Sequence, residues 1–248
     1  MVQSLVTARF IVAALRHPDD LLRVGTPAQS VLRPLELTAG VDAVFSSPIF
    51  GAGIDRQRVC AFRLSLGGVT VLAAAGCRMN GSLSAEHCSN NAQADLEFCV
   101  GEPGDELMPI WLRRRRAVCR VPPVNLDQDL YNRRFQLRVL AAPAGLPFDD
   151  LSAVTVPVML PRVGADVTLR FPYHAQRLHL LLLNPNRYEV IEGSHHYVFL
   201  SPFPDRITKE VGRPAQDRLD CDRRPFLNRM NAEIVRFFQG CFAAISGG

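Results

Sequence analysis

The sequence predicts an α/β protein with a mostly parallel sheet that is covered by helices on both faces. Two observations support this fold class. Short apolar runs, typical of buried strands, alternate along the chain with segments of helical periodicity. The chain also has 248 residues, of which 48% are hydrophobic and 21% charged, so it can bury one sizeable core. We therefore expect a single α/β domain over residues 1–248.

The expected strands and helices alternate in order along this domain. The apolar runs predict strands at residues 10–15, 59–64, 136–142, 154–160 and 187–193. Helices are expected at residues 34–45, after Gly67, at residues 174–183 and at residues 231–242. The last of these helices places most of its bulky apolar side chains on one stripe, which is typical of a helix that docks on a sheet.

Residues 78–134 interrupt this alternation. The segment is polar and rich in asparagine, contains Cys88 and Cys99, and shows no clean period. We interpret it as an insertion over one edge of the sheet. Such insertions often serve as a cap or lid over a binding site, and an irregular surface excursion is the alternative.

The charge of the chain does not favour a nucleic-acid partner. The formal net charge is only +4, and nearly all the basic residues are arginines. The run Arg113 to Arg116 could form a phosphate-binding patch, but a solvated basic face is the more common interpretation of such a run. We assign it no role and expect no nucleic acid as a partner.

The beginning of the chain does not read as a targeting segment. It has no basic region ahead of its apolar run, and residues 10–15 are too few to span a bilayer. We therefore expect no signal peptide, no transmembrane segment and no membrane partner, with a cytoplasmic location as the default. Pairing of Cys88 with Cys99, which lie in polar sequence, would instead be a sign of export.

No cofactor or metal is expected. His87 with Cys88 and Cys99, and His174 with His179, are of residue types that bind metals, but neither set has the spacing of a known zinc motif. A glycine-rich phosphate loop is also not found after any expected strand.

Polar residues that follow the expected strands form the candidate catalytic site. Ser65 follows the run at 59–64, Asp166 follows the run at 154–160, and the pair His195 and His196 follows the run at 187–193. In open α/β sheets, ligands bind beyond the carboxyl ends of the strands. A serine hydroxyl becomes a good nucleophile when an imidazole takes its proton and a carboxylate orients that imidazole. The order serine, acid, histidine is that of the catalytic triad in α/β-hydrolases.

The motifs around these residues resemble those of the dienelactone-hydrolase-like branch of the α/β-hydrolases. They are FIVAALRHPDD, RPLELTAGVDAVF, IDRQRVCAFRLSLGGVTVLAAAG, VPVMLPRVGADVTL, VIEGSHHYVFLSPF and NAEIVRFF. The resemblance implies a serine hydrolase that acts on a carboxylic ester or lactone without a cofactor. It assigns Ser65 as the nucleophile, Asp166 as the acid and His196 as the base, and the Leu66 N–H would stabilise the oxyanion. His196 is preferred to His195 because the family pattern places a small-residue turn before the histidine and an aromatic residue after it.

The chain departs from this family pattern in two places. Arg63 stands where the motif G-x-S-x-G has its first glycine, and only Gly67 matches the second. The family's early strands and the loop that supplies a second oxyanion donor are also not found, so we expect an N-terminally incomplete sheet. A truncated gene, an evolutionary remnant or a replacement donor near His17 would each account for this. The alternative function is therefore that of an inactive homologue that acts as a binding protein, and an exposed sheet edge would favour a homodimer or aggregation.

Overall fold

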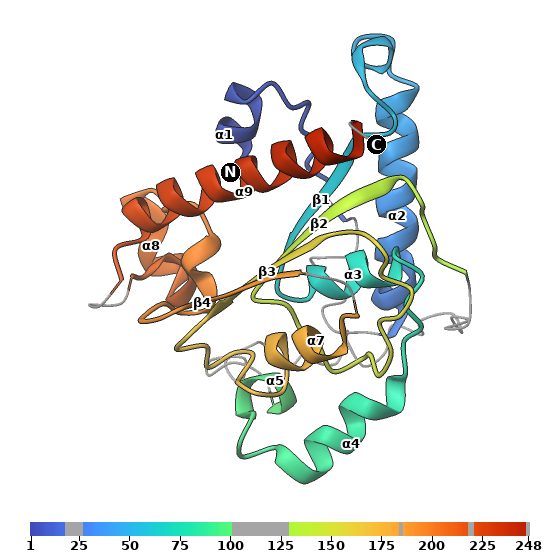
Figure 1. Ribbon diagram of the computed structural model, residues 1–248. Coiled ribbons are helices and arrows are strands. Elements are labelled where there is room, and N and C mark those ends of the chain that lie inside the picture. Colours follow the sequence, from blue (N-terminus) through green and yellow to red (C-terminus); the bar gives the residue numbers. More distant parts are fainter. Residues whose placement is uncertain (18–26, 101–128, 184–185, 218–220, 247–248) are drawn as a thin grey trace.

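The protein has a mixed α/β fold built on a parallel four-stranded sheet (Figure 1). The computed structural model describes residues 1–17, 27–100, 129–183, 186–217 and 221–246. The strands are β1 (Val59–Leu64), β2 (Phe135–Ala141), β3 (Val158–Val163) and β4 (Asn186–Ile191). They pair in parallel in the order β1-β2-β3-β4, so their carboxyl ends lie along one edge of the sheet.

Helices flank the sheet on both faces. The α-helices are α1 (Val2–Thr7), α2 (Pro27–Phe45), α3 (Gly67–Ala73), α4 (Gly81–Asn91), α5 (Leu96–Val100), α7 (Ala175–Leu181), α8 (Asp205–Val211) and α9 (Arg223–Ser246). Short 3-10 helices occur at η1 (Gly51–Gly53), η3 (His196–Phe199) and η4 (Arg213–Ala215). Helix α9 lies across one face of the sheet, and α2, α3 and α7 cover the other (Figure 1).

Alternating side chains of the central strands supply both halves of the core. Val139 and Met159 pack in the cluster that contains the apolar stripe of α9. Their neighbours Leu140 and Leu160 point to the opposite face and pack with α3 and α7. All four side chains are fully buried, as expected for central parallel strands with helices on both faces.

Most of the expected elements form, with shifted boundaries. Strand β3 begins at Val158 rather than at residue 154, because Val154 closes a turn in which its N–H donates to the Leu151 carbonyl at 2.9 Å. Helix α2 begins at Pro27 rather than at Pro34 and continues through Pro34. The structure contains a helix at each of the four expected places, and α9 extends the last of them in both directions.

The strand expected at residues 10–15 does not form. This segment has no regular secondary structure and is not part of the sheet formed by the described strands. It lies across from β1, and an apolar cavity of about 360 Å³ is lined by residues of both segments. An apolar run predicts that a segment is buried. A strand also needs a neighbouring strand with which its backbone can form hydrogen bonds. Here the cavity lies between the segment and β1.

Two helices form within the described part of the expected insertion. Helices α4 and α5 lie within residues 78–100, and a disulfide joins Cys88 of α4 to Cys99 of α5. The arginine run at 113–116 lies outside the described residues.

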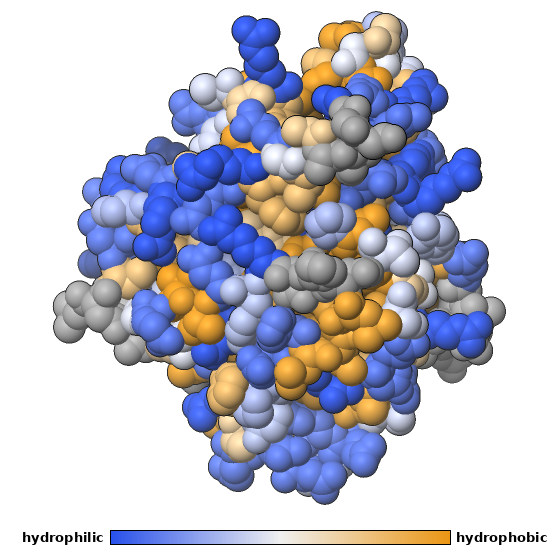
Figure 2. Space-filling model, viewed as in Figure 1, coloured by the Kyte–Doolittle hydropathy of each residue, from blue (hydrophilic) through white to orange (hydrophobic). Residues whose placement is uncertain are grey.

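Polar side chains cover much of the face drawn in Figure 2, and apolar residues gather there in a few patches. In the described ranges, no helix has the length and apolar character needed to cross a membrane.

Candidate active site

Ser65 occupies a sharp turn between strand β1 and helix α3. Its backbone φ is 57°, in the left-handed region that is strained for a residue other than glycine. Hydrogen bonds hold the turn in place: the Ser65 N–H donates to the Ala141 carbonyl at 3.0 Å, and the Ser65 carbonyl accepts from the N–H groups of Gly68 and Ala144 at 2.9 and 3.2 Å. A strained serine on a strand-turn-helix unit is the arrangement of a nucleophile elbow.

The turn accommodates Arg63 because Gly67, which lies next to the Arg63 stem, has no side chain. A Cβ atom placed on Gly67 would lie 3.1 to 3.4 Å from the aliphatic carbons of Arg63. The Arg63 stem therefore fills the space next to the Gly67 backbone. A Cβ on Gly68 would lie 2.7 Å from the Cβ of Pro143, so the start of α3 also packs closely against the end of β2.

His196 follows β4 and points back at Ser65. The chain leaves β4 through a turn with Gly193 at a φ of 69°, and His196 begins the 3-10 helix η3. The His196 side chain is 4% exposed. Its Nε2 lies 2.8 Å from the Ser65 Oγ, and its Nδ1 lies 2.9 Å from the Asp166 Oδ2.

Asp166 lies in the loop that follows β3, and its carboxylate is oriented by this loop. The Oδ1 atom accepts hydrogen bonds from the N–H groups of Thr168 and Leu169 at 3.0 and 2.8 Å. The loop is tied to the one after β4, since the Ala165 N–H donates to the Ser194 carbonyl at 2.9 Å. Asp166 and His196 are thus held on adjacent parallel strands, beyond the same edge of the sheet.

These contacts define the hydrogen-bond directions in the site. A carboxylate only accepts, so the His196 Nδ1–H donates to Asp166 and Nε2 is left to accept the Ser65 hydroxyl proton. The neutral imidazole can therefore act as a general base toward the serine, with its tautomer set by the aspartate. The structure brings together Ser65, Asp166 and His196, the three residues proposed from the sequence. His195 does not join them.

The Leu66 N–H lies next to the serine at the start of α3. Among the described residues it donates to no backbone carbonyl, and so it can donate a hydrogen bond to an oxyanion that forms at Ser65.

A hollow of about 320 Å³ lies beside the turn and is lined in part by His17, Arg63 and Gly67. His17 itself is buried and bonds the Glu36 carboxylate through Nδ1. The residues that follow His17 lie outside the described ranges.

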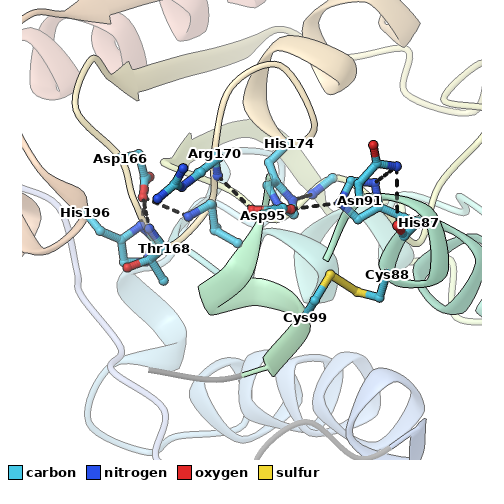
Figure 3. Close-up of polar contacts among 12 residues, drawn as sticks. His87, Cys88, Asn91, Asp95, Cys99, Asp166, Thr168, Arg170, His174 and His196 are labelled. Carbon is cyan, nitrogen blue, oxygen red and sulfur yellow. Dashed lines mark hydrogen bonds and ion pairs between the residues drawn. A yellow bond between two sulfur atoms is a disulfide. The ribbon is translucent and has the colours of Figure 1, made fainter. Parts of the chain in front are cut away.

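A second buried polar cluster lies behind the Asp166 loop. Asp95, just before α5, accepts hydrogen bonds from the Nε2 atoms of His174 and His87 at 2.8 and 3.0 Å (Figure 3). Burial raises the pKa of Asp95, but the hydrogen bonds from His174, the Arg170 N–H and His87 outweigh it and leave this pKa below its ordinary value. Asp95 is therefore a carboxylate at neutral pH.

The sequence did not indicate Asp95. It is 79 residues from His174, and nothing in the local sequence signals that the two will meet. His87 and His174 were considered as metal ligands, whereas in the structure both bind this carboxylate. Within the described ranges, no three His, Cys, Asp or Glu side chains are grouped so that they could hold a metal ion.

The sequence was compared with protein-family models and with curated proteins. No protein-family model matches the chain, and no curated protein matches it either.

Proposed function

We propose that the protein is a serine hydrolase of the α/β-hydrolase type, which cleaves a carboxylic ester or a lactone through an acyl-enzyme. The observation that carries the proposal is the continuous hydrogen-bonded chain from Ser65 Oγ through His196 to Asp166, with distances of 2.8 and 2.9 Å. Each of these residues follows a different parallel strand, and the serine has the strained backbone of a nucleophile elbow. A serine that only formed a turn would need neither partner.

The chemistry follows from the hydrogen-bond directions. Ser65 Oγ attacks the carbonyl carbon and gives its proton to His196 Nε2, while Asp166 stabilises the imidazolium that forms. The oxyanion of the tetrahedral intermediate is stabilised by the Leu66 N–H. When the intermediate collapses, the leaving oxygen takes the proton from His196, and the acyl group stays on Ser65.

The second half of the reaction releases the acid. Water attacks the acyl-enzyme carbonyl and gives a proton to His196, which then returns it to the Ser65 oxygen as that oxygen leaves. The products are a carboxylic acid and an alcohol, or a hydroxy acid if the substrate is a lactone. No cofactor takes part in either step.

The expected insertion at 78–134, which contains α4 and α5, would act as a cap over one side of this site.

Labelling with a fluorophosphonate probe tests the proposal. We expect the native protein to be labelled and to hydrolyse a p-nitrophenyl ester, because the probe requires a serine activated by a base. Ser65→Ala should abolish both, whereas Ser47→Ala, which changes a half-buried serine that accepts from the Ile49 and Phe50 N–H groups, should retain them. Circular dichroism checks that both variants are folded.

The other outcomes are equally informative. Labelling that persists in Ser65→Ala would overturn the assignment of the nucleophile. A folded native protein with neither labelling nor ester hydrolysis would favour the inactive homologue that acts as a binding protein.

A further inference from the structure

Asp95 is a fully buried carboxylate that joins three segments of the chain. It has no exposed surface and precedes helix α5. Its Oδ2 accepts from His87 of α4 and from His174, and its Oδ1 accepts from the backbone N–H of Arg170 at 3.3 Å. Figure 3 shows these contacts in a row that runs from the disulfide-linked helices to the loop of Asp166.

The contacts from Asp95 restrain the loop that orients Asp166. Arg170 directly follows Leu169, whose N–H, with that of Thr168, donates to the Asp166 carboxylate. His174 lies at the other end of the same loop, before α7. A second contact strengthens the attachment, because the Thr168 hydroxyl donates to the Glu97 Oε2 at 2.9 Å. The position of the acid loop therefore depends on helix α5 and on the residue that precedes it.

We propose that Asp95 is a positioning residue for the hydrolytic reaction: it fixes the loop that aims Asp166 at His196. The inference rests on the proposed function. Asp95 acts through Asp166 and does not itself reach Ser65 or His196, so its removal should reduce the fraction of molecules in which the triad is aligned.

The hydrogen-bond directions make the carboxylate difficult to replace. The Gly145 N–H donates to His174 Nδ1 at 3.3 Å, so His174 must carry its proton on Nε2 and donate it to Asp95. Asp95 consequently faces N–H donors at both oxygens. An asparagine at this position would turn its own NH₂ group toward at least one of them, and a buried donor would lose its acceptor.

Asp95→Asn is the direct test, with Asp150→Asn as the matched control. Asp150 is exposed and its carboxylate accepts from Ser152, so the control removes one carboxylate outside the acid loop. We expect Asp95→Asn to lower kcat for a p-nitrophenyl ester by about ten- to a hundred-fold, because a misplacement of about 1 Å can cost about 10²-fold in rate. KM should change little, and Asp150→Asn should retain the native kcat.

A double-mutant cycle with Asp166→Asn separates positioning from a general loss of structure. If Asp95 acts through Asp166, Asp95→Asn should have little further effect once Asp166 is an asparagine. An undiminished loss of kcat in the Asp166→Asn background would overturn the proposal, and so would a folded Asp95→Asn protein with native kcat.

If Asp95→Asn does not fold, His87→Phe takes its place in the cycle. This variant removes one donor to Asp95 and keeps an aromatic ring between Phe98 and Tyr173, and its smaller loss must likewise vanish with Asp166→Asn.

A spectroscopic measurement distinguishes failure of this inference from failure of the proposed function. The His196 Nδ1 proton shared with Asp166 should give a downfield proton resonance, which Asp166→Asn removes. We expect Asp95→Asn to shift or broaden it and Asp150→Asn to leave it unchanged. If the native protein proves inactive toward esters, this resonance still decides the positioning role, and an unchanged resonance in Asp95→Asn would overturn it.

Discussion

At the scale of single residues, Arg63 and Gly67 form a matched pair in the turn around Ser65. The aliphatic carbons of Arg63 lie 3.1 to 3.4 Å from the point where a Cβ atom on Gly67 would be. The sequence motif suggested that a small residue is needed at both positions. The structure indicates that one glycine is sufficient, because the arginine stem lies along the bare backbone and the serine still reaches a φ of 57°.

This pairing predicts that the effect of Gly67→Ala depends on which residue stands at position 63. The new methyl group would lie 3.1 to 3.4 Å from the Arg63 carbons, so either the Arg63 side chain or the turn must shift by a few tenths of an ångström. We expect the fluorophosphonate labelling rate to fall about tenfold or more, since the nucleophile is misplaced. Arg63→Ala should restore much of the rate when combined with Gly67→Ala, because it empties the same space. Equal losses from Gly67→Ala with and without Arg63 would contradict the pairing.

At the scale of elements, the sequence predicted the parts that depend on local pattern. The run at 59–64 became β1, and the order of Ser65, Asp166 and His196 after their strands places all three at one edge of the sheet. The segment at 10–15 has an equally apolar pattern, yet it pairs with no strand in the described part of the chain. Asp95 could not have been found from pattern either, because its partners come from α4 and from the loop before α7. Long-range pairing decides both cases.

The disulfide between Cys88 and Cys99 covalently links α4 and α5, the helices on either side of Asp95 in the sequence. It joins two residues separated by 11 positions, and a loop of this length predicts a contribution of about 2–3 kcal/mol to the free energy of unfolding. We expect the double variant Cys88→Ser, Cys99→Ser to lose about this amount in urea-induced unfolding. Reductant should destabilise the native protein similarly and leave the double variant unchanged. An effect of reductant on the double variant would contradict the assignment of the stabilisation to this bond.

Cys60 and Cys77, two of the described cysteines outside this disulfide, do not interfere with this measurement. Burial raises the pKa of Cys77 to about 12 and raises the pKa of Cys60 still further. Thiolates, not thiols, exchange with disulfides. At neutral pH these two cysteines therefore remain protonated and do not compete with the reductant for Cys88 and Cys99.

At the scale of the whole molecule, the outer edge of β1 is one of the two edges of the described sheet, and an apolar cavity lies beside it. Strand β1 pairs with β2, and no other strand in the described ranges pairs with its opposite edge. The cavity of about 360 Å³ next to this edge is lined largely by apolar side chains from residues 10–15, β1, α2 and α9. A sheet edge with unpaired backbone groups beside apolar surface tends to pair with another chain.

We therefore expect the protein to associate as its concentration rises, and a charge in the cavity should reduce this association. Ile11 lines the cavity and is 49% exposed, whereas Ile49 is 81% exposed and lies outside it. Ile11→Lys should shift the mass measured by light scattering toward the monomer, because a lysine in this cavity would have to be desolvated when a second chain approaches. Ile49→Lys adds the same charge elsewhere and should leave the measured mass as in the native protein. A native protein that stays monomeric at high concentration would contradict the prediction, and equal effects of the two lysines would show that association depends on net charge and not on this edge.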